Sequence, residues 1–120
     1  MRILNLYADA DGETHFREIE IECADEKPWG NASKRLEATG IIFVEADGTA
    51  LARSLAQPHP APCRQYVIVL QGGVEVTTSD GESRAIGAGE VVMVEDTTGK
   101  GHTTKLLGEK LHCGIFVPID

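Results

Sequence analysis

Short apolar stretches recur along the chain and are separated by turn residues, chiefly glycine, proline and aspartate-glycine pairs. They predict about ten strands, over residues 1–7, 15–23, 40–45, 49–56, 66–70, 74–78, 83–86, 90–95, 102–107 and 111–117. Strands at this spacing are typical of an all-β sandwich or barrel. The only helical feature that the pattern indicates is a turn over residues 33–38, inside a long connection over 25–39.

The alternation of polar and apolar residues predicts which face of a strand is buried. Over residues 15–23 it places Ile19, Ile21 and Cys23 on the core face. Residues 66–70 are apolar on both faces, which predicts a strand that is buried on both sides of its sheet.

Turn residues predict how the strands are connected. The pairs Gly72-Gly73 and Asp80-Gly81 each stand between two strands and predict two hairpins. Three prolines fall within residues 57–62. Because proline cannot donate to the hydrogen bonds of a sheet, we expect this segment to be irregular or to lie at an edge.

Composition narrows the class of protein without naming a function. The length of 120 residues predicts a single domain over residues 1–120, and 42% hydrophobic with 25% charged residues is ordinary for a globular chain. A net charge of −8 without a basic cluster argues against nucleic-acid binding. No apolar run approaches the roughly 20 residues of a membrane span. The three cysteines have no metal-finger or paired spacing, which predicts reduced thiols in a cytoplasmic protein.

Three polar residues flank the apolar strands in the middle of the chain. His59 lies between two prolines, Gln65 opens the strand over 66–70, and His102 follows a glycine turn. A buried amide without partners costs on the order of 1–3 kcal/mol, so Gln65 needs hydrogen bonds from neighbours or from a ligand. The rigid backbone around His59 suits a preorganised binding residue, and it suits equally a segment that blocks an edge.

This part of the chain resembles the first motif of the cupin family. In that motif two histidines precede a glutamate, and a glycine follows six residues after it. Here Gln65 stands at the glutamate and Gly72 at that glycine. His59 stands at the first histidine, Ala61 at the second, and Arg53 at the leading glycine.

The family's second motif is present in part. Gly89 and Glu90 resemble its opening, and Gly101-His102 resembles its histidine end, with two additional residues between them. Leu106 stands where the family has asparagine. The resemblance covers residues 40–117, which is most of the chain.

The resemblance implies a fold, a metal site and an assembly. The fold would be a cupin-type double-stranded β-helix, which is a jelly-roll barrel. Typical cupins bind a divalent metal such as Fe, Mn, Ni, Zn or Cu through three histidines and one glutamate. Carried over to this chain, the ligands are His59, Gln65 and His102. The resemblance also implies a homodimer, with residues 1–7 as a candidate for an exchanged strand.

Three functions remain open at this point. One is a metal-dependent cupin enzyme acting on a small organic molecule, of dioxygenase, isomerase or lyase type. The alternative is a metal-free small-molecule-binding cupin without catalysis, in which His59 and His102 hydrogen-bond Gln65 or a water. The third is a structural or regulatory dimer.

The other candidate residues are predicted to be structural. Cys63 is expected to be a packed thiol on the same face as Gln65, His112 a surface or structural histidine, and Trp29 an aromatic that closes one end of the barrel. Surface or interface ion pairs are expected from the charged residues near the two motifs, which are Arg64, Glu95, Asp96 and Lys100.

Overall fold

Eleven strands and no helix make up the chain in a computed structural model, which describes residues 1–47, 56–108 and 111–120. Within these residues no helix could cross a membrane. The strands are β1 (Arg2–Ala8), β2 (Thr14–Glu20), β3 (Asp25–Lys27), β4 (Gly30–Ala32), β5 (Ile42–Ala46), β6 (Gln65–Gln71), β7 (Gly73–Thr78), β8 (Ser83–Gly87), β9 (Val91–Val94), β10 (His102–Leu106) and β11 (His112–Pro118). The predicted all-β class is confirmed, whereas the strand predicted over 49–56 falls, except for its last residue, outside the described residues.

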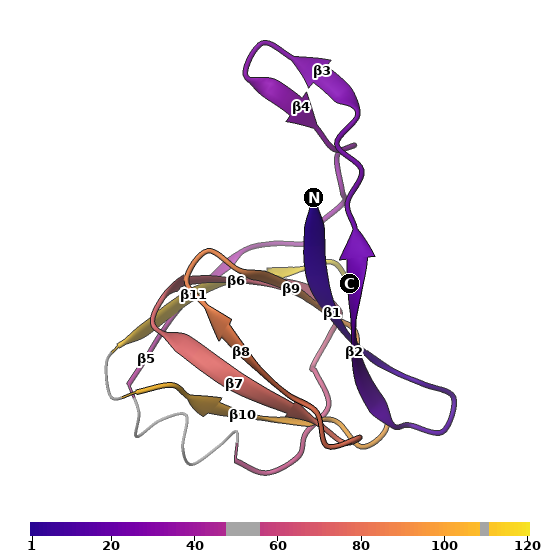
Figure 1. Cartoon of the computed structure of the whole chain (residues 1–120), viewed down its shortest axis with the longest axis vertical. Helices are drawn as coiled ribbons and strands as arrows, with labels where there is room; N and C mark the ends of the chain where they lie inside the picture. The colour runs from indigo at the N-terminus through magenta and orange to yellow at the C-terminus, as the bar shows by residue number, and fades with distance from the viewer. Residues whose placement is uncertain (48–55, 109–110) are drawn as a thin grey trace.

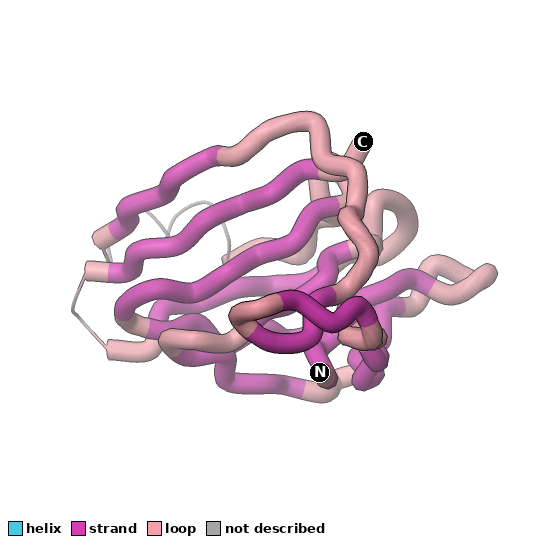
Figure 2. Tube along the Cα trace, turned by 90° about the horizontal axis from the view of Figure 1, so that it is seen from above, coloured by secondary structure: helices cyan, strands magenta, loops and turns pink. Residues whose placement is uncertain are grey.

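Two sheets lie face to face and enclose the core (Figures 1 and 2). The larger has six strands in the order β2-β1-β9-β6-β11-β5, and the smaller has three in the order β10-β7-β8. In the larger sheet β1 runs parallel to β9, while its other neighbouring strands are antiparallel. Valine, leucine and isoleucine side chains from both sheets meet in one core, which includes Leu6, Val69, Val74, Val76, Ile86, Val92 and Val94.

The buried face of β2 is the opposite of the predicted one. Phe16 pairs with Leu6 and faces the interior, so Ile19, which pairs with Ile3, lies on the outer side of the sheet. Ile21 and Cys23 lie beyond the end of the strand. The alternation predicted the wrong face because β2 is an edge strand whose second half is largely exposed on both faces. The charged Glu18 can therefore lie on the inner face of the strand without being buried.

The glycine pair after β6 does not form a hairpin. β6 pairs with β9 and β11, whereas β7 pairs with β8 and β10, so the chain crosses from one sheet to the other at this turn. Gly72 has a φ of 76°, and a Cβ there would lie 3.1 Å from the Cα of His112. The crossing is favoured because β6 and β7 both carry apolar side chains that pack across the interior. The second predicted hairpin, at Asp80-Gly81, is confirmed between β7 and β8.

The connection over 25–39 contains a small hairpin in place of the expected helical turn. β3 and β4 form a two-stranded sheet that projects from the body of the molecule (Figure 1). Trp29 lies at the turn of this hairpin and is 81% exposed. It therefore does not close an end of the barrel, because its backbone is carried away from the two large sheets.

Part of the outer face of the six-stranded sheet, on β6 and β5, carries apolar side chains that are open to solvent. β6 was expected to be buried on both sides, but Leu70 on its outer side is 52% exposed. Phe43 on the edge strand β5 is 73% exposed. On the interior side the expectation is met, because Gln65, Val67 and Val69 all line the space between the sheets.

Candidate functional site

A cavity of about 330 Å³ lies between the two large sheets. This volume is at the lower end of the range of roughly 300–1,000 Å³ found for small-molecule sites. Most of the lining is aliphatic or aromatic, and the polar residues among the described lining are His59, Gln65, His102, Thr104 and His112. None of the described residues that line it carries a carboxylate, ammonium or guanidinium group.

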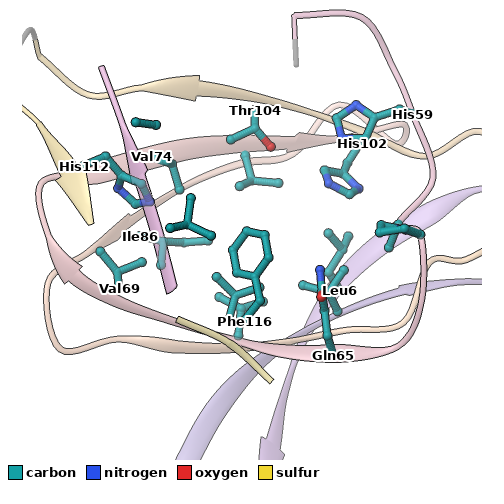
Figure 3. A pocket seen from close by; sticks show the side chains of 18 of the residues that line it. Leu6, His59, Gln65, Val69, Val74, Ile86, His102, Thr104, His112 and Phe116 are labelled. Carbon is teal, nitrogen blue, oxygen red and sulfur yellow. The ribbon is translucent and has the colours of Figure 1, made fainter. Parts of the chain in front are cut away.

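The three residues predicted as a site are brought together at one end of this cavity (Figure 3). His59 and His102 form an isolated antiparallel bridge, with each backbone N–H donating to the carbonyl of the other at 3.0 Å. Their ring centroids are 4.7 Å apart. Gln65, the first residue of β6, extends its amide toward the same end from the opposite sheet (Figure 3).

A glycine makes this close approach of the two histidine backbones feasible. Gly101 has a φ of 74°, a region that favours glycine. A Cβ at this position would lie 2.2 Å from the carbonyl carbon of His59. The carbonyl of Gly101 also accepts a hydrogen bond from the hydroxyl of Thr14 at 2.7 Å. The loop before β10 is therefore fixed against the proline-rich segment.

Asp96 belongs to the site, although an ion pair at the surface was expected for it. Its side chain is 0% exposed, and Oδ2 lies 2.5 Å from Nδ1 of His102. Its other oxygen, Oδ1, is buried and has no hydrogen-bond partner among the described residues. The ion pairs expected of its neighbours are present, from Arg64 to Asp120 and from Lys100 to Glu13.

These contacts orient both histidine rings of the bridge. An ionised carboxylate can only accept, so with Asp96 ionised Nδ1 of His102 is the donor of this hydrogen bond. Nδ1 of His59 donates in the same way to the carbonyl of Gln57 at 3.0 Å. In its neutral form, with the proton on Nδ1, each ring presents Nε2 as an acceptor.

We expect the buried Asp96 to contribute far more to stability than an exposed aspartate. Asp96→Ala leaves Nδ1 of His102 buried without an acceptor, which should lower the free energy of unfolding by about 1–3 kcal/mol. Asp120→Ala is the control, because it removes an exposed ion pair worth about 0–1 kcal/mol. Urea unfolding of both variants measures the difference. Equal losses would show that Asp96 is solvated in solution.

Gln65 has a weak local partner. The thiol of Cys63 donates to Oε1 of Gln65 over 3.8 Å, which confirms that the two side chains share a face. The three cysteines are free thiols, as expected. Cys113 is only half-buried, on the outer side of β11.

The residues present do not fit the four-ligand metal set of a typical cupin. Two imidazoles and one neutral amide are available, and Ala61 supplies no donor where the second histidine would stand. Among the described residues no three histidine, cysteine, aspartate or glutamate side chains are grouped so that they could hold a metal ion. The nearest carboxylate, Asp96, is directed at Nδ1 of His102.

A fourth polar residue, His112, lies at the opposite end of the cavity (Figure 3). It was expected to be a surface or structural histidine, and its exposure of 6% excludes a surface position; no described residue forms a hydrogen bond with its Nδ1. Sequence reasoning missed its position because it is the first residue of β11, where the burial pattern of the strand was ambiguous.

The sequence matches no protein-family model and no curated protein. The interpretation of the site therefore depends on the chemistry of its own residues.

The two histidines outside the bridge should give stability profiles of opposite slope. Burial lowers the pKa of His112 below 6.5, so as the pH falls the unfolded chain is protonated first and the fold loses stability. The hydrogen bond to Asp9 raises the pKa of His15, so its contribution is complete below pH 6.5 and disappears as the pH rises through the folded-state pKa.

Unfolding at about pH 5 and about pH 8 tests these two slopes. Relative to the wild type, His112→Leu should gain stability at the lower pH and His15→Gln should lose it. Parallel profiles for the two variants would contradict the assignment of both environments.

Proposed function

We propose that this chain is a cupin-type jelly-roll barrel that binds a small, mainly apolar organic molecule without a metal. The observation that carries the proposal is the cavity between the sheets, which is lined by aliphatic and neutral polar side chains. Transfer of apolar surface into such a lining contributes about 25 cal/mol per Å². A charged ligand would meet no charged partner on the described lining and would have to lose its hydration.

The end formed by His59, Gln65 and His102 gives the ligand its orientation. Two free Nε2 acceptors and one amide lie around an otherwise apolar space. A hydroxyl or amide N–H of a ligand can donate to either imidazole, and the Gln65 amide can donate or accept. Such a site anchors one polar group of the ligand and leaves the remainder in the apolar part.

The metal-dependent enzyme remains the second candidate because of one observation. Histidines that bind metals commonly donate their other ring N–H to a carboxylate or a backbone carbonyl. His102 does so to Asp96, and His59 does so to Gln57. The donor set is nevertheless one histidine and one carboxylate short of the family's.

Titration with octanol in the presence of a chelator separates the two candidates. The binding proposal expects purified protein with far less than one metal ion per chain and octanol binding that the chelator leaves unchanged. One metal ion per chain that is lost in His102→Ala would favour the enzyme instead. Metal-free protein that does not bind octanol at all would overturn the binding proposal.

We also propose a homodimer, which would form through an exposed apolar surface and not through exchange of residues 1–7. β1 pairs with β2 and β9 of its own chain, so an exchange of residues 1–7 would have to replace both pairings. The exposed Phe43 on the edge strand β5 and Leu70 on β6 lie on the outer face of the same sheet and offer apolar surface that needs no exchange. Light scattering of the purified protein measures the assembly, and a monomer mass would refute the dimer.

A further inference from the structure

His112 is a polar group that the fold buries and leaves unsatisfied. Its side chain is 6% exposed, and no acceptor or donor from the described part of the chain reaches Nδ1. A buried polar atom without a partner costs on the order of 1–3 kcal/mol, and a hydrophobic side chain of similar size would avoid that cost. Val69, Val74 and Ile86 surround this end of the cavity and offer no polar atom in their side chains (Figure 3).

Two glycines pack closely around His112. A Cβ at Gly72 would lie 3.1 Å from the Cα of His112. A Cβ at Gly114, two residues further along β11, would lie 3.1 Å from the carbonyl oxygen of Ile68 and in ordinary van der Waals contact, 3.6 Å, with Nε2 of His112. The glycines therefore bring the backbone close around His112, and its imidazole lines the cavity within reach of a ligand.

The two polar ends of the cavity are separated by the length of one strand. β7 runs from one polar end to the other. Its last residue, Thr78, pairs with His102. Its first residue, Gly73, follows Gly72, which contacts His112. Five residue steps of about 3.3 Å place these ends roughly 17 Å apart along the backbone. Apolar side chains line most of the space between them, with Thr104 as the one hydroxyl on the described lining.

We propose that the cavity selects an elongated, uncharged molecule with a polar group at each end, one of which hydrogen-bonds to His112. This inference rests on the proposed binding function and adds the class of ligand. The group at the His112 end is a neutral oxygen, a hydroxyl or a carbonyl, because a neutral imidazole has one donor and one acceptor to offer. Burial lowers the pKa of His112, which keeps the ring neutral near pH 7. The other end of the molecule contacts His59, Gln65 or His102.

The test compares two probes that differ only at the second end. Octanol carries one terminal hydroxyl, and the matching octanediol carries one at each end. Calorimetric titration of the wild type and of His112→Leu gives the ratio of the two dissociation constants in each protein. Loss of the imidazole should weaken diol binding relative to octanol by about fivefold or more, because a buried hydroxyl is left unpaired.

Ile86→Leu is the control variant, since it changes the shape of the same end without removing a polar atom. The ratio should stay unchanged in this variant. Nitrogen NMR of the wild-type imidazoles is a second readout that needs no substitution, and the His112 signals should shift with the diol and stay in place with octanol.

The possible outcomes separate this inference from the function on which it rests. If octanol and the diol both bind, but their ratio is the same in the wild type and in His112→Leu, the role of His112 is refuted and the binding function stands. Failure of both probes to bind the wild type would overturn the binding function and the inference together.

Discussion

Gly101→Ala should destabilise the protein by about 3 kcal/mol or more, because two separate penalties coincide at this residue. The first is the left-handed backbone, with a φ of 74°, which costs a residue with a side chain about 1–2 kcal/mol. The second is a collision with backbone, since the new Cβ would lie 2.2 Å from the carbonyl carbon of His59. Backbone atoms cannot rotate away as a flexible side chain can, so the bridge between His59 and His102 has to open.

Gly81→Ala isolates the first penalty. Gly81 has a φ of 93°, yet no atom lies within 4 Å of its added Cβ. This variant should lose only about 1–2 kcal/mol. Urea unfolding measures both variants, and the ring NMR signals of His59 and His102 should change only in Gly101→Ala. Equal losses in the two variants would show that the loop before β10 does not press against the proline-rich segment.

Val69→Phe should abolish most of the ligand affinity while the fold is retained. Val69 is 1% exposed and projects from β6 into the cavity, so the larger ring occupies space that a ligand would use. Loss of contact with two methylene groups, at about 0.8 kcal/mol each, should raise the dissociation constant of octanol about tenfold or more.

Ile68→Phe is the matched control on the same strand. Ile68 precedes Val69, and its side chain points to the outer face of the sheet. The same aromatic ring placed there should leave octanol binding unchanged. If this outer variant weakens binding as much as Val69→Phe, the ligand lies outside the cavity. Far-UV circular dichroism of both variants checks that the sheets are intact.

Local alternation predicted most strands of the two large sheets and part of the cavity, but it did not predict the hairpin of β3 and β4. The in-phase positions Gln65, Val67 and Val69 all line the interior, because alternation places every second side chain on one face. The same rule failed on β2, where Phe16 is the inner residue. Where an edge strand extends past the sheet that covers it, charged residues can occupy its inner face. The alternation of polar and apolar residues then no longer indicates which face is buried.

Pairing between distant segments could not be predicted from turn residues alone. The glycine pair after β6 has the composition of a hairpin, yet it connects strands of two different sheets. Whether such a pair forms a hairpin or a crossing between sheets depends on which strands pair with β6 and β7. Here β11 pairs with β6, and β10 pairs with β7. Both partners come much later in the sequence.

The burial of Asp96 likewise depends on contacts with residues that are not its neighbours in the sequence, so local composition does not predict it. Its neighbours are Glu95 and a run of turn residues, which is the composition of an exposed loop. The carboxylate is buried because the loop folds back so that the carbonyl of Asp96 accepts a hydrogen bond from the backbone N–H of Ala61 and its side chain meets His102. His59, Gln65 and His102, which the sequence analysis singled out, line the same cavity, whereas the side chain that orients His102 was not predicted.

The proposed function requires that a small apolar molecule binds in the cavity between the two sheets. Intermolecular nuclear Overhauser effects between octanol and methyl-labelled, metal-free protein test this directly. We predict contacts from the alkyl chain to the methyl groups of Val69, Val74 and Ile86. Contacts confined to Leu70 and other residues of the outer face would contradict the account, because they would place the ligand on the exposed side of the six-stranded sheet.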